Sequence, residues 1–391
     1  MAVMDYSDIL NPRAVRLKPS GIRKFFDITE NMDNVISLGV GEPDFQTPWH
    51  IRHAGISSLE GGKTRYTANR GMEQLREEIS QYMRRRFNLS YNTKQVLVTV
   101  GGSEAIDLAV RALVKDGDEV LIPQPSFVCY EPIVRLAGGV PVIIDLKTEN
   151  NFVLTPEQIE EKITPKTKAL ILPFPGNPTG AIMKRCELEK IAPVIKKHNL
   201  MVISDEIYAE LTYGNTRHVS IAEIEDMWER TVIISGFSKS YSMTGWRLGY
   251  ALAPEEIISL MTKIHQFAIM SAPTTSQYAA IEALRHGDND IRTMVDEYDT
   301  RRRLIVEGFR NIGLECFEPL GAFYAFPCIC STGLTSEAFC ENLLYSKKVA
   351  LVPGSAFGDC GEGFVRASYC YSVAHIKQAL ERIGEFLKEC R

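Results

Sequence analysis

The residues best suited to covalent chemistry lie in one stretch, Ser235 to Tyr250, which holds a lysine among glycines and hydroxyl side chains. Lys239 follows the apolar run 231–234, and Arg247 stands eight residues after it. Lysine is rarely buried unless it is paired or chemically employed, and ligands of α/β proteins collect at strand ends. The stretch therefore fits a reactive amine beside a phosphate, although a lysine in a surface loop would have the same local sequence.

The surrounding pattern predicts the elements that position this lysine. Apolar runs alternate with helical or loop segments between residues 95 and 234, which indicates a mainly parallel sheet covered on both faces. The predicted strands are 96–100, 119–122, 140–144, 168–172, 201–204 and 231–234. Groups that follow parallel strands should gather at the edge formed by the carboxyl ends. These groups are Gly102 and Ser103, residues 125–127, residues 177–180, residues 205–208, and Ser238 with Lys239.

A glycine turn follows the first of these strands. Residues 101–104 read Gly-Gly-Ser-Glu and precede a predicted helix at 105–114. A helix that opens in this way offers free N–H groups and a positive dipole end to an anion. The dinucleotide pattern G-x-G-x-x-G is absent, so the turn predicts a phosphate site of another kind.

The length of 391 residues predicts two domains. After residue 254 the pattern changes to helices at 255–267, 276–286 and 290–311, strand-like pieces at 315–318, 323–326, 349–352 and 364–369, and a closing helix at 373–388. Earlier helices are predicted at 20–31 and 71–87. We expect a large α/β domain at 46–288 and a smaller α+β domain formed by 1–45 and 289–391.

Composition and charge exclude several classes of function. The 44 basic and 49 acidic residues give a net charge of −5, which argues against a nucleic-acid surface. The nine cysteines are scattered, so neither a disulfide framework nor a metal site is expected, and a cytoplasmic location fits best. The N-terminus lacks the apolar core of a signal peptide, and no apolar run reaches the length of a membrane span.

Several motifs together resemble those of one family, the class I aminotransferases among the fold-type I pyridoxal-phosphate enzymes. In chain order the motifs are Gly41-Glu42-Pro43-Asp44-Phe45, Asn177-Pro178-Thr179-Gly180, Asp205-Glu206-x-Tyr208, Ser238-Lys239 and Phe364-Val365-Arg366. Residues 22–25 and 353–358 look most like the aromatic amino acid aminotransferases and the related aminotransferase A group, which includes N-acetyl-diaminopimelate aminotransferases. The resemblance covers nearly the whole chain.

The resemblance implies pyridoxal 5′-phosphate as the cofactor and assigns its reactive contacts. Lys239 would form the Schiff base with the cofactor and move protons as the base. Asp205 would pair with the pyridinium N–H, although a helix-capping role or competition from Glu206 is also conceivable. Tyr208 and Asn177 would donate hydrogen bonds to the phenolic oxygen.

The remaining contacts are implied in the same way. Phe127 would stack on the cofactor ring. Arg366, with the backbone of Gly41, would bind the α-carboxylate of the substrate, and Asn177 is also expected to contact the substrate. Tyr66 would reach across a homodimer interface to the phosphate of the partner subunit.

The phosphate itself would be held by a cup on the same chain. Its expected members are Gly102, Ser103, Ser238 and Arg247. Gly236 stands where many relatives have serine, so one phosphate-binding hydroxyl is missing.

The expected function is transfer of the α-amino group of an aromatic or related amino acid to 2-oxoglutarate by a ping-pong mechanism. Alternatives within the fold are an aspartate or N-acetyl-L,L-diaminopimelate aminotransferase, or a C–S β-lyase; a ligand-sensing regulator is a further alternative from another class. Ser103 stands where aspartate-preferring relatives carry a lysine that reads the distal carboxylate, which argues against strict aspartate use. Arg23, with its neighbours Ile22 and Phe25, is placed near the entrance of the site by the resemblance.

Overall fold

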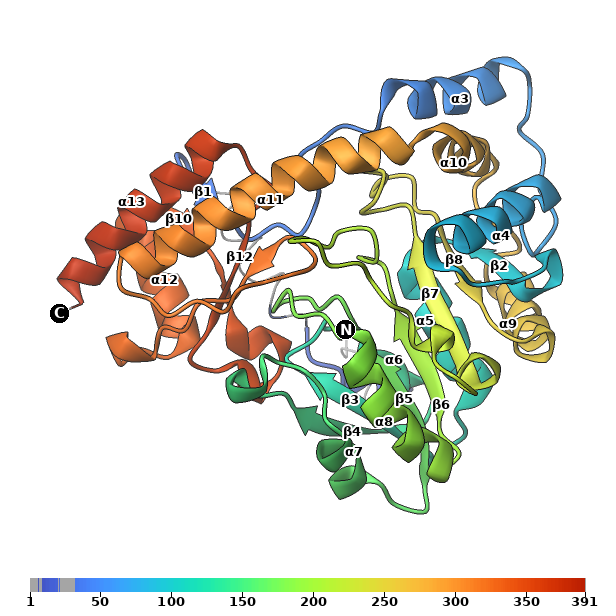
Figure 1. The fold of residues 1–391 in the computed structure, drawn as a ribbon, viewed down its shortest axis with the longest axis horizontal. Coiled ribbons are helices and arrows are strands. Elements are labelled where there is room, and N and C mark those ends of the chain that lie inside the picture. The colour runs from blue at the N-terminus through green and yellow to red at the C-terminus, as the bar shows by residue number, and fades with distance from the viewer. Residues whose placement is uncertain (1–5, 7–8, 20, 22–31, 391) are drawn as a thin grey trace, which may run out of the picture.

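The protein is built around a twisted seven-stranded sheet, with a smaller body of helices and short strands at one side (Figure 1). The computed structural model describes residues 6, 9–19, 21 and 32–390. The strand order is β2-β8-β7-β6-β5-β3-β4, and only β8 runs antiparallel to its neighbours. The fold is therefore the α/β class that the alternating sequence pattern predicts.

The strands of this sheet lie close to their predicted positions. Their bounds are β2 Val96–Thr99, β3 Glu119–Gln124, β4 Val140–Asp145, β5 Thr167–Leu172, β6 Met201–Asp205, β7 Thr231–Gly236 and β8 Gly249–Leu252. Strand β8 is absent from the prediction because its first residues, Gly249 and Tyr250, belong to the stretch that contains Lys239 and Arg247. Its insertion between β2 and β7 places the start of β8 beside the end of β7.

Both faces of the sheet are buried, which explains why its strands are apolar at nearly every position. In β5, Leu170 packs in a cluster with helix α8, whereas the next residue, Ile171, packs on the opposite face with α5 and α9. The helices around the sheet are α3 Trp49–Glu60, α4 Glu73–Phe87, α5 Gly101–Leu113, α6 Tyr130–Leu136, α7 Pro156–Lys162, α8 Arg185–Lys197, α9 Glu255–Ala268 and α10 Thr274–His286. Among the described residues no helix combines the length and apolarity needed to cross a membrane.

A long helix connects the sheet to the smaller body. Helix α11 spans Asp288–Asn311 and runs from α10 to a position beside α13 (Figure 1). The other elements of the smaller body are β1 Ile36–Ser37, β9 Tyr324–Ala325, α12 Ser336–Lys347, β10 Val349–Ala350, β11 Val352–Pro353, β12 Val365–Ser368 and α13 Val373–Glu389; a short helix, α1 Pro12–Val15, lies near the N-terminus.

The N-terminal segment pairs with the C-terminal part of the chain. Strand β1 runs parallel to β10, with Ile36 opposite Val349, and Leu38 belongs to the same buried cluster as the α11 and α13 side chains. This pairing supports the proposed division into domains 46–288 and 1–45 plus 289–391, whose boundaries stay a prediction.

Several local predictions need correction. Helix α5 begins at Gly101, so the glycine turn forms its first turn instead of preceding it. Residues 315–318 form only an isolated bridge, Cys316 to Pro327. Residues 349–352 do not form one strand, because β10 pairs with β1 whereas β11 pairs with β12. The helix predicted at 20–31 lies outside the described residues, apart from Gly21.

One close backbone contact yields a prediction about stability. A Cβ atom on Gly249 would lie 2.6 Å from the carbonyl carbon of Gly101 and 2.7 Å from the nitrogen of Gly102. We expect Gly249→Ala to destabilise the cofactor-free protein by about 1–3 kcal/mol, because strand β8 and the first turn of α5 must separate.

Thermal or chemical unfolding of the cofactor-free protein measures this effect. Gly245→Ala is the matched control, because a Cβ at Gly245 meets no atom within 4 Å. Equal stability of the two variants would contradict the prediction.

Candidate active site

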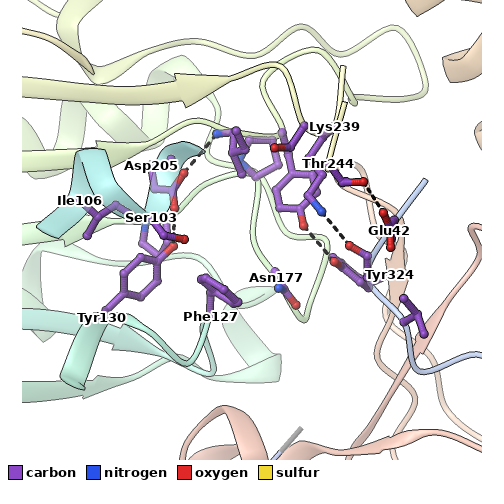
Figure 2. Close-up of a pocket in the computed structure, with 18 of the residues that line it drawn as sticks. Glu42, Ser103, Ile106, Phe127, Tyr130, Asn177, Asp205, Lys239, Thr244 and Tyr324 are labelled. Atoms are coloured by element: carbon purple, nitrogen blue, oxygen red, sulfur yellow. Dashed lines mark hydrogen bonds between the residues drawn. The ribbon is translucent and has the colours of Figure 1, made fainter. Parts of the chain in front are cut away.

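One cavity of about 520 Å³ lies at the carboxyl ends of the parallel strands, where the sheet faces the smaller body. It is lined by all the predicted site residues except Tyr66, namely Gly41, Gly102, Ser103, Phe127, Asn177, Asp205, Tyr208, Ser238, Lys239, Arg247 and Arg366. Figure 2 shows Asp205 and Tyr130 on one side of this pocket and Tyr324 and Glu42 on the other. Tyr66 is 81% exposed and is not part of the lining.

Lys239 follows β7 and extends between the two sides of the cavity (Figure 2). Its Nζ donates a hydrogen bond of 2.7 Å to the carbonyl oxygen of Gly41. Burial lowers the pKa of Lys239 to about 8. A larger fraction of this amine is therefore neutral near neutral pH than for an exposed lysine, which makes it a better nucleophile.

Asp205, the last residue of β6, is 6% exposed. Its carboxylate accepts hydrogen bonds from the hydroxyl of Tyr130 at 2.8 Å and from the backbone N–H of Ile207 at 3.2 Å. Burial raises the pKa of Asp205 to about 6, and these two donors act against that rise. Among the described residues Asp205 has no cationic partner, so its negative charge is uncompensated.

The adjacent carboxylate, Glu206, has a different environment. It accepts hydrogen bonds from Ser204 at 2.8 Å, Ser220 at 2.6 Å and His218 at 2.9 Å, and it does not line the cavity. Glu206 is therefore occupied by structural contacts, which leaves Asp205 as the carboxylate available to a bound group. The contact with the N–H of Ile207 is a local turn contact and not the helix cap considered from the sequence, because residues 207–210 form turns and no helix begins there.

An anion site is formed where α5 begins. The first N–H groups of a helix have no intrahelical acceptor, and here they belong to the turn at Gly102 and Ser103. The guanidinium of Arg247 lies so close to Gly101 that a Cβ there would be 2.8 Å from Nη2. Arg247 itself has a φ of 52°, a conformation that non-glycine residues adopt rarely and that is often found at functional sites.

The missing hydroxyl at Gly236 has a packing explanation. A Cβ on this residue would lie 2.9 Å from the Cα of Gly249 on the neighbouring strand β8. The close approach of β7 and β8 therefore excludes a side chain at Gly236.

Arg366 lies at the other end of the cavity, on strand β12, and is 2% exposed. Its guanidinium donates to the side-chain oxygen of Asn177 at 2.9 Å and to the carbonyl of Gly39 at 2.6 Å, and no described residue accepts a hydrogen bond from its Nε. Burial lowers the pKa of Arg366. Both acceptors are neutral, so no described carboxylate balances this charge.

The buried charges of Asp205 and Arg366 show which chemical groups would fit the cavity, and both pyridoxal phosphate and an amino acid carry such groups. Asp205 needs a cation, which a pyridinium N–H supplies, and Arg366 needs an anion, which an α-carboxylate supplies. The start of α5 and Arg247 offer donors to a phosphate, and Lys239 lies between the two ends. The cavity is complementary to the cofactor and to an amino acid together.

Comparison with known proteins identifies the family. A sequence model described as aminotransferase class I and II matches residues 33–383. The chain belongs to this family. Members of the family use pyridoxal 5′-phosphate and act on amino acids and 2-oxo acids, as the resemblance of the motifs indicates.

Individual relatives of this aminotransferase cover nearly its full length. It is 52% identical to the "Putative aminotransferase YugH" of Bacillus subtilis over 95% of this chain and 96% of that protein. It is 44% identical to an aspartate aminotransferase of Pyrococcus abyssi over 100% of this chain and 99% of that protein. The crystal structure of an aromatic aminotransferase from Pyrococcus horikoshii matches with a TM-score of 0.90 at 43% identity, covering 93% of this chain and 99% of that one.

The lining residues of this aminotransferase that the sequence reasoning missed include four polar side chains, those of Tyr130, Tyr324, Thr244 and Glu42. Tyr130 stands three residues after Phe127, a spacing that could have indicated it, whereas Tyr324 lies in a two-residue strand that carries no motif. Thr244 and Glu42 form a side-chain hydrogen bond that joins the loop after Lys239 to the N-terminal segment (Figure 2).

The raised pKa of Asp205 predicts a pH effect on the cofactor-free enzyme. The folded-state value of about 6 exceeds the ordinary 3.8, so the ionised carboxylate destabilises the folded protein. This penalty is absent below about pH 4, grows as the pH rises to about 6, and then stays constant. The difference corresponds to on the order of 3 kcal/mol.

We expect Asp205→Asn to remove this penalty. Unfolding free energies of the two cofactor-free proteins, measured between about pH 4 and 7, should show the variant gaining stability relative to the wild type as the pH rises. A difference that does not change with pH would contradict the assignment. The same variant should lose most of its aminotransferase activity, because the pyridinium would lack its anionic partner.

Proposed function

We propose that this aminotransferase transfers the α-amino group of an aromatic or related amino acid to 2-oxoglutarate in two half-reactions. The observation that carries the proposal is the distribution of charge in the cavity: a buried carboxylate at one end, a buried guanidinium at the other, and neither with a described counterion. Family membership favours this activity over lysis or ligand sensing.

In each half-reaction, residues at the ends of the sheet strands contact the cofactor and move protons. When bound, pyridoxal phosphate supplies an electron sink for the carbanion formed at the substrate Cα. Asp205 holds the pyridinium proton, and Tyr130 holds Asp205 in place through the hydrogen bond of 2.8 Å. Lys239 is the attachment point for the cofactor and moves the proton, because its amine is central in the cavity and its pKa is about 8.

The other cofactor contacts divide between ring and phosphate. Phe127 would stack on the ring of the bound cofactor, and Tyr208 would donate a hydrogen bond to its phenolic oxygen. The side-chain oxygen of Asn177 is occupied by Arg366, which leaves its NH₂ group free to donate to the same oxygen. The phosphate is held by the cup formed by Gly102, Ser103, Ser238 and Arg247.

The charges that line the cavity support the choice of donor. Arg366 binds the α-carboxylate, Lys239 is used in chemistry, and Arg247 belongs to the phosphate, so no further cation lines the cavity among the described residues. Glu42 adds a negative charge to the lining, and a distal carboxylate next to it would be repelled. A donor with an uncharged aromatic side chain avoids this repulsion. The distal carboxylate of 2-oxoglutarate then needs a cation from elsewhere, either Arg23, which is outside the described residues, or a second subunit.

We also propose a homodimer in which Tyr66 completes the phosphate site of the partner. Tyr66 is 81% exposed, and its loop contacts the segment after α9 through a hydrogen bond from Asn69 to the carbonyl of Met270. Phe267 and Ile269 of the same region are 85% and 45% exposed. A second copy would bury these side chains and receive Tyr66.

A panel of amino donors tests the proposed substrate class. With 2-oxoglutarate as the acceptor, tyrosine and phenylalanine should exceed aspartate in kcat/KM by at least about tenfold, which corresponds to 1.4 kcal/mol of discrimination. N-acetyl-L,L-diaminopimelate tests the alternative substrate. Equal rates for all donors, or a preference for aspartate, would overturn the assignment. In the absence of 2-oxoglutarate one oxo acid should form per site, whereas a lyase would release ammonia continuously.

Mixing two defective variants tests the shared site. Lys239→Ala lacks the attachment point, and Tyr66→Ala lacks the contact to the partner phosphate. In a hybrid dimer one site carries both substitutions and the other carries neither, so mixing should restore activity in about a quarter of the sites by statistical pairing. Measurements at limiting cofactor should show this gain relative to the unmixed proteins. Activity equal to the average of the two variants would exclude a shared site.

A further inference from the structure

Tyr324 contacts both Tyr208 and Arg366. Its hydroxyl lies 2.9 Å from the hydroxyl of Tyr208, and its ring lies beneath the guanidinium of Arg366, with 4.5 Å between Cζ and the ring centroid. The ring of Phe357 lies 4.8 Å from the same Cζ. Tyr324 is 1% exposed, yet it lines the cavity, so it faces the interior of the cavity and not the outer surface of the protein (Figure 2).

The surroundings hold Tyr324 in a fixed position. Strand β9 pairs with β12, and Ser368 is the partner of Tyr324, so Tyr324 and Arg366 lie on adjacent strands. Gly41 packs directly on the phenol, because a Cβ at Gly41 would overlap the Tyr324 hydroxyl. The phenol has little room to move away from Tyr208.

The hydrogen bond between the two phenols has a defined direction when the cofactor is bound. Among the described residues neither hydroxyl has another hydrogen-bond partner. Burial raises the pKa of Tyr324 to about 12 and that of Tyr208 well above its ordinary value, so both phenols are protonated at neutral pH. If the Tyr208 hydroxyl donates its hydrogen bond to the phenolic oxygen of the cofactor, then the Tyr324 hydroxyl must be the donor in the hydrogen bond between the two phenols.

We propose that Tyr324 is a positioning residue that couples the carboxylate-binding arginine to the hydroxyl of Tyr208. This inference rests on the roles proposed above for Tyr208 and Arg366. The Tyr324 hydroxyl donates to the Tyr208 oxygen and makes Tyr208 a stronger donor to the cofactor, because hydrogen bonds in a chain polarise one another. The Tyr324 ring, together with Phe357, stabilises the guanidinium of Arg366, which has no described carboxylate partner.

The two functions of Tyr324 can be separated by substitution. Tyr324→Phe keeps the ring under Arg366 and removes the hydroxyl, whereas Tyr324→Leu removes both. Phe357→Leu is the matched control, because it removes the other ring on Arg366 and leaves the two phenols unchanged. The titratable groups that face the phenols, Arg366, Lys239, Cys370 and Tyr371, remain in all three variants.

The first readout is the pH midpoint of the visible absorption of the cofactor-loaded protein. A weaker donor at Tyr208 favours the protonated form of the cofactor, so Tyr324→Phe should raise this midpoint by about half a pH unit or more, a threefold change in proton affinity. Tyr208→Phe should raise it further, and adding Tyr324→Phe to that variant should have no additional effect. Phe357→Leu should leave the midpoint unchanged.

The second readout is the affinity for 3-phenylpropionate, a carboxylate without an amino group, measured by calorimetry on the cofactor-loaded protein. Tyr324→Leu and Phe357→Leu should each weaken binding roughly fivefold or more, whereas Tyr324→Phe should change it less than twofold. Equal losses in Tyr324→Phe and Tyr324→Leu would overturn the role assigned to the ring.

The outcomes distinguish this inference from the proposals on which it rests. If Tyr208→Phe shifts the midpoint and Tyr324→Phe does not, the coupling is wrong and the role of Tyr208 stands. If neither variant shifts it, the role of Tyr208 fails and the coupling fails with it. If the wild type does not bind 3-phenylpropionate, the proposed aromatic substrate class fails, and the absorption measurement still decides the role of the Tyr324 hydroxyl.

Discussion

A buried guanidinium, which has no carboxylate partner among the described residues, holds the two parts of this active site together. Arg366 donates to Asn177, in the loop after β5, and to the carbonyl of Gly39, in the N-terminal segment, and its own strand belongs to the smaller body. Three segments distant in sequence therefore meet at one charge. Because burying a charge without a counterion is unfavourable, the surrounding structure must supply part of the stabilisation, and in the role proposed for Arg366 a substrate carboxylate would supply the rest.

The opposite end of the cavity also holds a buried charge without a described counterion, but there the charge is negative. Asp205 is held by Tyr130 and by the backbone of Ile207 in a position where its ionised form is costly. Glu206, one residue later, is in contrast fully engaged by a histidine and two serines. The two adjacent carboxylates thus differ in environment, because the side chain of Asp205 lines the cavity whereas that of Glu206 lies among buried hydrogen-bond donors.

The sequence indicates which strand ends meet at the cavity more readily than it indicates the short strands of the smaller body. Parallel strands bring the ends of distant segments to one edge, so Lys239, Asp205 and Asn177 could be expected to meet from the strand pattern alone. Tyr324 could not, because it comes from a strand of two residues whose partner is set by contacts far along the chain. The run 349–352 shows the same limit: its apolar pattern indicates strand, but alternation does not reveal that its two halves pair with different partners. The proposed contact of Tyr66 with a partner subunit would depend on a second chain, which a single sequence does not describe.

Helix α11 gives the smaller body a mechanical property. Its 24 residues make a rod about 36 Å long, and its first turns pack with the large sheet through Ile291 whereas later turns, from Met294 on, pack around the core that carries β9 and β12. A rod that is clamped at its base acts as a lever, so a tilt of about 5° at that end displaces the far end by about 3 Å. Such a displacement is as long as a hydrogen bond. A small change in packing where α10 meets α11 would therefore cause a larger displacement at the distant end of the smaller body. The stiffness of α11 limits how precisely the smaller body is positioned relative to the large sheet.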